Sequence, residues 1–261
     1  MPAYERLLAI LRGMGSTVLA YSGGVDSTFL LKAAMDAGIP CLAVTAFSET
    51  MPESDCKAAE EMAAGLGAAH RIIRSHELEN PDFVRNTRER CFFCKDGLFA
   101  LLQDIAEKEG YACIADGSNT DDLSDWRPGR RAAEKHGVRS PLVEAGLSKE
   151  EIRTLSREKG LATWDNPSSP CLSSRFPYGI QITGEALRRV ELTESFIKGL
   201  GFRELRVRSH GDLARIEIPK GSIDRFLSMS MREQISERLK ELGFRYVCLD
   251  LEGFRSGRLN E

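Results

Sequence analysis

The stretch SGGVDS at residues 22–27 constrains the fold of this chain more than any other. It lies between an apolar, β-branched run at residues 17–21 and a helix-like run at residues 28–37, so we expect it to join a buried strand to a helix. A glycine pair there lets backbone N–H groups approach an anion, and the helix N-terminus and the serine hydroxyls add to that attraction. The stretch therefore predicts a phosphate-binding loop. The alternative is an ordinary tight turn with a serine cap.

This loop has neither the Gly-Lys-Ser/Thr ending of a Walker A loop nor the glycine spacing of a dinucleotide fingerprint. Asp26 would repel phosphates unless a divalent cation lay between them, so we interpret it as a magnesium partner. The pattern resembles the PP-loop of the N-type ATP pyrophosphatases, which split ATP into AMP and pyrophosphate. The resemblance implies ATP and Mg²⁺ as cofactors. The expected ATP-binding residues are Ala20, Ser22, Gly23, Gly24, Asp26, Ser27, Thr45 and Ser48.

Composition and charge narrow the class of protein. The 261 residues suffice for one large domain or two modest ones, and 42% hydrophobic with 29% charged residues is typical of a soluble globular chain. We find no run long enough to span a bilayer and no signal peptide, so we expect a cytoplasmic protein without a membrane partner. The net charge of −3 argues against a nucleic-acid partner. Of seven cysteines, Cys41 and Cys113 fall in expected strands and are interpreted as small core residues.

Apolar strands alternate with helices over residues 1–165, which predicts an α/β PP-loop domain with a parallel sheet. Ligands bind at the carboxyl ends of such strands. The expected strands are 17–21, 41–45, 69–73 and 111–115, and the expected helices are 28–37, 55–66 behind a Ser54 cap, and 95–108. Residues 116–130 read as a polar working loop over the ATP site. Ser148 begins a capping box, which predicts a helix to Lys159.

Residues 166–182 are predicted to form a linker, because the three prolines within this segment oppose regular structure. This linker nevertheless carries Cys171 and Arg175, which a connector without a task would rarely need. Residues 183–261 are expected to form a smaller α+β domain that binds substrate and supports oligomerisation. Its expected elements are a helix at 184–200 capped by Thr183, a hairpin of strands 204–208 and 213–218, a helix at 231–242 and a strand at 244–249, with an antiparallel sheet.

Cys91 and Cys94 form a CxxC pair, for which Cys171 is the natural third member. A closed zinc site would lack ligands, because only one CxxC occurs and no histidine lies near it. Three thiolates could hold a [4Fe–4S] cluster and leave one iron open. The alternative is three independent thiols.

Several motifs together resemble the LarE family over nearly the whole chain. These are SGGVDS at 22–27, RCFFCK at 90–95, DGSN at 116–119, PCLSSR at 170–175, and RVR at 206–208 followed by ARIE at 214–217. The resemblance implies an ATP-dependent sulfurtransferase that forms AMP and pyrophosphate. Such enzymes convert the two carboxylates of pyridinium biscarboxylic acid mononucleotide to thiocarboxylates, for the nickel-pincer nucleotide cofactor of lactate racemase.

The resemblance also implies roles for particular residues, with Asp26 and Cys171 as the catalytic pair. In one style of the family the cysteine matching Cys171 gives up its own sulfur. In the other it joins a CxxC to hold a [4Fe–4S] cluster that carries the donor sulfide, and this chain has the CxxC. Arg206 and Arg208 would bind the phosphate of the nucleotide substrate. Glu194, Glu217 and Asp224 would form an acidic metal site, and the chain would assemble as a homo-oligomer, often a hexamer.

Two other functions remain open at this point. A PP-loop tRNA thiolase could use the same loop and a cluster, although the net charge and the lack of a long basic run disfavour it. A nucleotide-binding regulator with a degenerate site is disfavoured by the intact loop, which retains Asp26.

Overall fold

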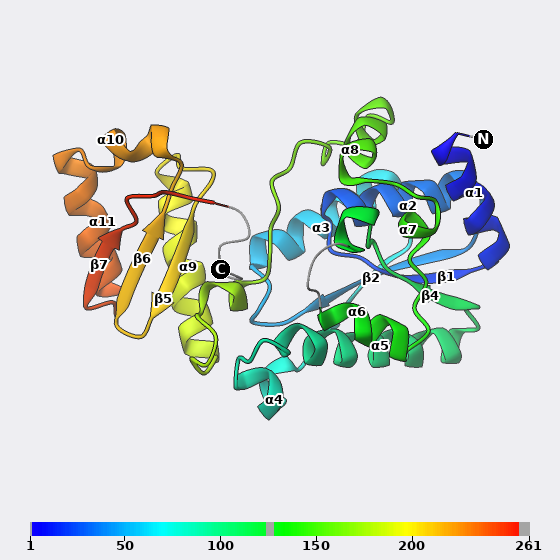
Figure 1. Cartoon of the computed structure of the whole chain (residues 1–261), viewed down its shortest axis with the longest axis horizontal. Helices are drawn as coiled ribbons and strands as arrows, with labels where there is room; N and C mark the ends of the chain where they lie inside the picture. Colours follow the sequence, from blue (N-terminus) through cyan, green and yellow to red (C-terminus); the bar gives the residue numbers. More distant parts are fainter. Residues whose placement is uncertain (1, 124–127, 256–261) are drawn as a thin grey trace. The chain divides into compact units, whose positions relative to one another are not determined.

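The computed structural model describes residues 2–123 and 128–255, and the chain divides into two compact units (Figure 1). Unit 1 comprises residues 1–83 and 88–169, and unit 2 comprises residues 84–87 and 170–261. The short segment 84–87 belongs to unit 2 because the buried Asn86 amide donates to Pro177 O at 2.8 Å and to Ile180 O at 2.9 Å.

Unit 1 is built on a four-stranded parallel sheet with the strand order β3-β2-β1-β4. Its strands are β1 (Thr17–Ala20), β2 (Cys41–Phe47), β3 (His70–Arg74) and β4 (Cys113–Ala115). Strands β2 and β3 are added in turn on one side of β1, and β4 is added on its other side. The carboxyl ends of β1 and β4 therefore flank the switch point where α/β sheets bind ligands.

Helices cover both faces of this sheet, and side chains alternate between the faces along each strand. Val18 packs on the face covered by α5 and α6, whereas Leu19 packs on the face covered by α1 and α2 (Figure 1). The helices of unit 1 are α1 (Ala3–Met14), α2 (Val25–Ala37), α3 (Glu53–Leu66), α4 (Pro81–Val84), α5 (Arg90–Glu109), α6 (Pro128–Lys135), α7 (Pro141–Glu144) and α8 (Lys149–Glu158). The short 3₁₀ turns η1 (Glu77–Glu79) and η2 (Thr120–Leu123) complete the unit.

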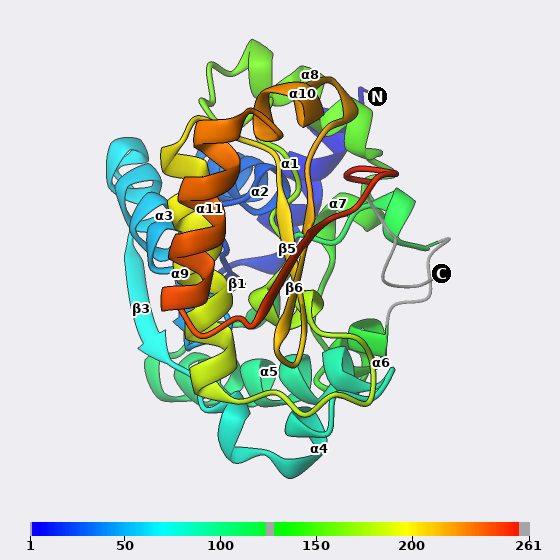
Figure 2. The same ribbon diagram turned by 90° about the vertical axis from the view of Figure 1, so that its left-hand side faces the viewer.

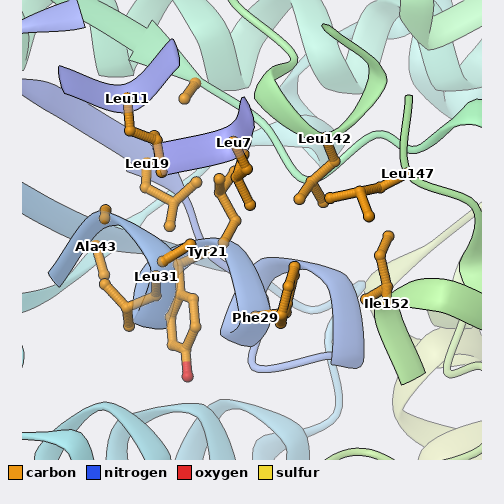
Figure 3. Packing of buried hydrophobic residues seen from close by; sticks show 14 of the residues in the cluster. Leu7, Leu11, Leu19, Tyr21, Phe29, Leu31, Ala43, Leu142, Leu147 and Ile152 are labelled. Carbon is orange, nitrogen blue, oxygen red and sulfur yellow. The ribbon is translucent and has the colours of Figure 1, made fainter. Parts of the chain in front are cut away.

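The larger core of unit 1 joins segments that are distant in sequence. Figure 3 shows side chains from α1, β1, β2, α2, α7 and α8 packed together in this core. Phe29 of α2 and Leu142 of α7 are fully buried there. Val25, the first residue of α2, is buried in the same cluster, so this packing holds the start of α2 and the end of the glycine-rich loop. The labelled residues are Leu7, Leu11, Leu19, Tyr21, Phe29, Leu31, Ala43, Leu142, Leu147 and Ile152.

Unit 2 contains a three-stranded sheet in the order β5-β6-β7, with α9 and α11 packed against it (Figure 2). Its elements are η3 (Leu172–Arg175), α9 (Gly184–Gly199), β5 (Arg206–His210), β6 (Leu213–Glu217), η4 (Lys220–Ser222), α10 (Ile223–Phe226), α11 (Met229–Glu241) and β7 (Tyr246–Leu249). The predicted β5–β6 hairpin is confirmed. The expected antiparallel sheet is wrong at β7, which runs parallel to β6 because α11 carries the chain back across the sheet.

In unit 1 some of the predicted strands, caps and helix boundaries match the structure and others differ. The parallel sheet is confirmed, and Ser148 caps α8 with a full capping box. The predicted Ser54 cap is wrong, because α3 already begins at Glu53 after Pro52. Helix α5 starts at Arg90, five residues before the expected start, so the CxxC pair is helical.

Residues 116–130 do not form one continuous loop. They contain η2 and the start of α6, which begins at Pro128, a residue suited to the first turn of a helix. Part of the predicted working loop, residues 124–127, lies outside the described residues.

In unit 2, Thr183 caps α9 as expected, and its hydroxyl accepts from Ala186 N at 3.2 Å.

Candidate functional site

The glycine-rich loop of unit 1 requires glycine at its second position. Gly23 has a φ of +71°, and a Cβ placed there would lie 2.7 Å from Ala59 Cβ and 2.8 Å from Ala59 Cα. The loop is therefore pressed against α3, with Ser22 exposed and Gly23 and Gly24 half-buried. Gly24 precedes the helix in an extended conformation, with a ψ of 173°.

The hydroxyl groups of the loop bind one another weakly. The Ser22 and Ser27 oxygens are 3.2 Å apart, Ser22 N donates to Ser27 Oγ at 3.3 Å, and Gly24 N donates to Ser22 Oγ at 3.4 Å. These distances lie at the long end of the hydrogen-bonding range. The donors can therefore be turned toward the oxygens of an anion at little cost.

Asp26 lies in the first turn of α2, and its two carboxylate oxygens have different surroundings. Its Oδ2 forms an ion pair with the ammonium group of Lys149, the first residue of α8. Its Oδ1 is buried and accepts no hydrogen bond from the described part of the chain. A buried, unsatisfied carboxylate oxygen is a suitable ligand for a divalent cation, so this residue fits the predicted magnesium.

Sequence reasoning missed Lys149, because the capping box around it was interpreted as purely structural. One physical signal could have found it. A lysine in the first turn of a helix faces the positive end of the helix dipole, which is unfavourable without a nearby acid. Its backbone N donates to Asp121 Oδ2 at 3.1 Å, so the segment after β4 holds the start of α8 in place.

The segment after β4 adjoins the loop, as expected for neighbouring parallel strands. A Cβ on Gly117 would lie 3.1 Å from Ser27 N, so the two backbones meet at the start of α2. Asp116 is held by Ser118 Oγ at 2.7 Å and by Ser140 Oγ at 2.8 Å. The pairing of β1 with β4 and the approach of Gly117 to Ser27 therefore place the carboxyl ends of the two strands side by side at the switch point.

The predicted residues on β1 and β2 are mostly engaged within the protein. Thr45 Oγ1 donates to Tyr21 O at 3.0 Å and lies 2.9 Å from His70 Nε2. Burial lowers the pKa of His70. The buried Ser48 hydroxyl lies 3.0 Å from Thr50 Oγ1, and Ala20 ends β1 half-buried. Their contacts with ATP stay predictions.

Cys91 and Cys94 lie one helical turn apart in the first turns of α5, so their side chains share a face. Cys91 is exposed and Cys94 is half-buried, with its sulfur 3.9 Å from Glu77 Oε1. The start of α6 packs beside them, since a Cβ on Gly129 would lie 3.4 Å from Cys91 O. The pair belongs to unit 1, whereas Cys171 belongs to unit 2.

Cys171 is exposed, but Arg175 holds the turn next to it through hydrogen bonds to backbone carbonyl groups. The guanidinium group of Arg175 donates to Pro170 O at 2.7 Å and to Cys171 O at 3.1 Å. It also forms two hydrogen bonds of 2.9 Å with Glu194, and both side chains are buried. The predicted linker therefore contains a fixed turn, η3, rather than only irregular chain.

A second arginine contacts the same turn from the hairpin. Arg208 forms a bidentate pair with Glu217 at 3.1 and 2.9 Å and donates to Ser174 O at 2.8 Å. Burial, followed by the positive charge of Arg175, lowers the pKa of the neighbouring Arg206 to about 10. An anion bound beside Arg206 would relieve that unfavourable environment.

The predicted acidic metal site is not assembled in this arrangement. Glu194 and Glu217 have arginine partners, and Asp224 is exposed in the first turn of α10. Within residues 2–123 and 128–255, no three histidine, cysteine or acidic side chains form a group that could hold a metal ion. The metal role of these three acids stays a prediction.

A parallel α/β sheet with a lysine-free, glycine-rich loop at its switch point defines an ATP-using enzyme of the PP-loop class. In the same described ranges, every helix is too short or too polar to traverse a lipid bilayer. No protein-family model matches the chain.

Comparison with known proteins identifies the family within this class. The chain is 43% identical to an uncharacterized protein of Synechocystis over 98% of its own length and 96% of the relative. It is 38% identical to the pyridinium-3,5-bisthiocarboxylic acid mononucleotide synthase of Lactiplantibacillus plantarum, over 98% of this chain and 92% of the relative. A probable tRNA sulfurtransferase of Methanobrevibacter smithii is 24% identical over only 56% of this chain. The chain belongs to the LarE family and is an ATP-dependent sulfur-inserting enzyme.

Proposed function

We propose that this enzyme converts the carboxylates of pyridinium-3,5-biscarboxylic acid mononucleotide to thiocarboxylates, on the route to the nickel-pincer nucleotide. The observation that carries the proposal is the exposed Cys171 on a turn anchored by Arg175, in a chain whose other unit has an ATP-type loop. The full-length similarity to the Lactiplantibacillus plantarum synthase supports the same substrate.

The first step is activation of the carboxylate, because a carboxylate is a poor electrophile. Its oxygen attacks the α-phosphorus of ATP, the bond to the β-phosphate oxygen breaks, and pyrophosphate leaves. The backbone of Gly23 and Gly24 and the hydroxyls of Ser22 and Ser27 hold the phosphates. Asp26 would hold magnesium, which supplies charge neutralisation on the phosphates. The product of this step is an acyl-adenylate.

The second step is attack by sulfur on the acyl carbon, which expels AMP. In one route the nucleophile is the Cys171 thiolate. Loss of its α-proton and cleavage of its Cβ–S bond then release the thiocarboxylate and leave dehydroalanine at position 171. In the other route Cys91, Cys94 and Cys171 would hold a [4Fe–4S] cluster, which supplies a donor sulfide. The CxxC pair on one face of α5 supports the second route.

Arg206 and Arg208 are proposed to bind the substrate phosphate. They lie two residues apart on β5 and therefore share a face of the sheet. The lowered pKa of Arg206, caused first by burial, supports an anionic partner.

The experiment uses anaerobically purified protein with ATP, Mg²⁺ and pyridinium-3,5-biscarboxylic acid mononucleotide, and measures pyrophosphate, AMP and thiocarboxylate. The wild type should form all three, and Asp26→Asn should form none. A protein that releases pyrophosphate only with tRNA would support the tRNA thiolase instead. Absence of substrate-dependent pyrophosphate from the wild type would contradict the proposal.

A second measurement separates the two sulfur routes. About four irons per chain, lost in Cys91→Ala, would support the cluster route. Iron-free protein that loses hydrogen sulfide from Cys171 in a single turnover would support the sacrificial route. Mass spectrometry of the peptide around residue 171 distinguishes dehydroalanine from an intact cysteine.

A further inference from the structure

We propose that Lys149 is the phosphate-binding cation of the ATP site, and that a divalent cation at Asp26 releases it for that task. This inference rests on the proposed ATP chemistry and names a residue that the loop sequence does not contain. In the nucleotide-free chain Lys149 neutralises Asp26, and with ATP bound it contacts the phosphates and later the pyrophosphate.

The charge of the loop favours an additional cationic side chain near the phosphates. Residues 22–27 contain one acid and no lysine or arginine, although the ligand is strongly anionic. Backbone amides and hydroxyls supply only partial charges. Among the described residues, Lys149 forms an ion pair with this loop, so its ammonium group lies beside the place where phosphates are expected.

The position of Lys149 allows an exchange of partners. Its backbone is fixed, because Ser148 caps α8 and Lys149 N donates to Asp121. Its side chain is 35% exposed and that of Asp26 is 23% exposed. An ion pair this accessible to water contributes little and can be broken, while the flexible four-carbon stem lets the ammonium group move.

Lys149 satisfies only one of the two carboxylate oxygens of Asp26. Lys149 occupies Oδ2, whereas Oδ1 is buried and unsatisfied among the described residues. A divalent cation would satisfy that oxygen and would repel the ammonium group. Lys149 and the divalent cation therefore compete for Asp26 in the absence of phosphates, and both favour the phosphates once these are bound.

This competition predicts opposite effects of one substitution. In Lys149→Met, Mn²⁺ should bind the nucleotide-free protein up to about fivefold more tightly, because its competitor is gone. Inorganic pyrophosphate with Mg²⁺ should bind about tenfold more weakly or worse, because a charge-assisted hydrogen bond is lost. Lys149→Arg should recover part of the pyrophosphate affinity. A purely structural role would weaken both ligands or neither.

The chain supplies a closely matched control in Lys159, which follows the same helix. Lys159 pairs with Asp36 of α2 at 3.3 Å, and their exposures are 32% and 24%. The two lysines thus link opposite ends of α8 and α2. Lys159→Met should leave the binding of Mn²⁺ and of pyrophosphate unchanged.

Isothermal titration of the full chain with MnCl₂, and separately with pyrophosphate and Mg²⁺, provides the test. If the wild type forms AMP, then unchanged pyrophosphate affinity or weaker Mn²⁺ binding in Lys149→Met would overturn the inference and leave the proposed function standing. If the wild type itself binds neither ATP nor pyrophosphate, the proposed function fails. Circular dichroism of each variant verifies that it is folded, and Lys149→Gln gives a second substitution with the same expected signs.

Discussion

Arg175 and Glu194 face each other through two hydrogen bonds of 2.9 Å, with 2% and 3% of their side chains exposed. The same guanidinium group binds the carbonyl oxygens of Pro170 and Cys171. The same carboxylate also accepts from Val207 N at 2.9 Å. One buried pair therefore links the turn of Cys171, helix α9 and strand β5.

Breaking this pair should destabilise unit 2. Glu194→Gln leaves a buried guanidinium group without its counter-charge, and we expect a loss of about 3–5 kcal/mol. Hydrogen–deuterium exchange over residues 184–199 and 206–217 measures the loss within the unit. The control is Glu185→Gln, an exposed residue on the same helix, which should change little. Equal exchange in the two variants would contradict a structural role for the pair.

The pair also predicts how stability depends on pH. Burial alone would raise the pKa of Glu194, but Arg175 and hydrogen bonds outweigh it and hold that pKa below 4.5. A carboxyl whose pKa is lower in the folded state stabilises the fold above its unfolded pKa and loses that contribution as pH falls through the folded one. The free energy of unfolding should therefore decrease as the pH is lowered beneath 4.5. That part of the slope should be absent from Glu194→Gln.

The approach of the loop to α3 predicts the effect of a methyl group at Gly23. Gly23→Ala should cost more than the roughly 1–2 kcal/mol of a left-handed non-glycine residue, because its Cβ would overlap Ala59. Gly38 at the other end of α2 has a similar φ of +73° with open space around it, so Gly38→Ala isolates the backbone cost. Urea unfolding and ATP binding compare the two. A similar cost, with ATP binding retained by both, would count against the close contact.

The hairpin arginines should respond differently to substitution. Arg208→Gln removes a bidentate partner of the buried Glu217 and should reduce stability by several kcal/mol, about the cost of breaking a buried pair. Arg206→Gln removes a charge that burial already disfavours, as its lowered pKa of about 10 indicates, so the loss should be smaller. Inorganic phosphate should raise the melting temperature of the wild type and have less effect on Arg206→Gln. An undiminished shift in that variant would exclude Arg206 as a phosphate ligand.

The sequence was informative where local chemistry decides structure. The SGGVDS loop, the alternation of strands with helices and the caps at Ser148 and Thr183 depend on neighbouring residues. The loop joins a strand to a helix and these two caps form as expected, whereas the expected Ser54 cap does not. The parallel direction of β7 depends on how α11 crosses the sheet, which no local pattern encodes.

The candidate site was harder to predict, because its contacts join distant segments. Lys149 meets Asp26 across 123 positions, and Arg208 reaches Ser174 across 34. The capping box accounts for Ser148 and Glu151 but not for Lys149, whose unfavourable place at the helix N-terminus is the one local signal of a second role. Glu194 reads as a surface acid on an amphipathic helix, although it is buried against Arg175.

The most direct test of the account measures whether activation and sulfur donation are separable. Cys171→Ala should still form AMP and pyrophosphate when ATP and pyridinium-3,5-biscarboxylic acid mononucleotide are present, and it should form no thiocarboxylate. Cys248→Ala, which alters another exposed cysteine of unit 2, should form all three products. Thiocarboxylate formation at the wild-type rate by Cys171→Ala, or loss of AMP formation in the folded variant, would contradict the division of labour proposed here.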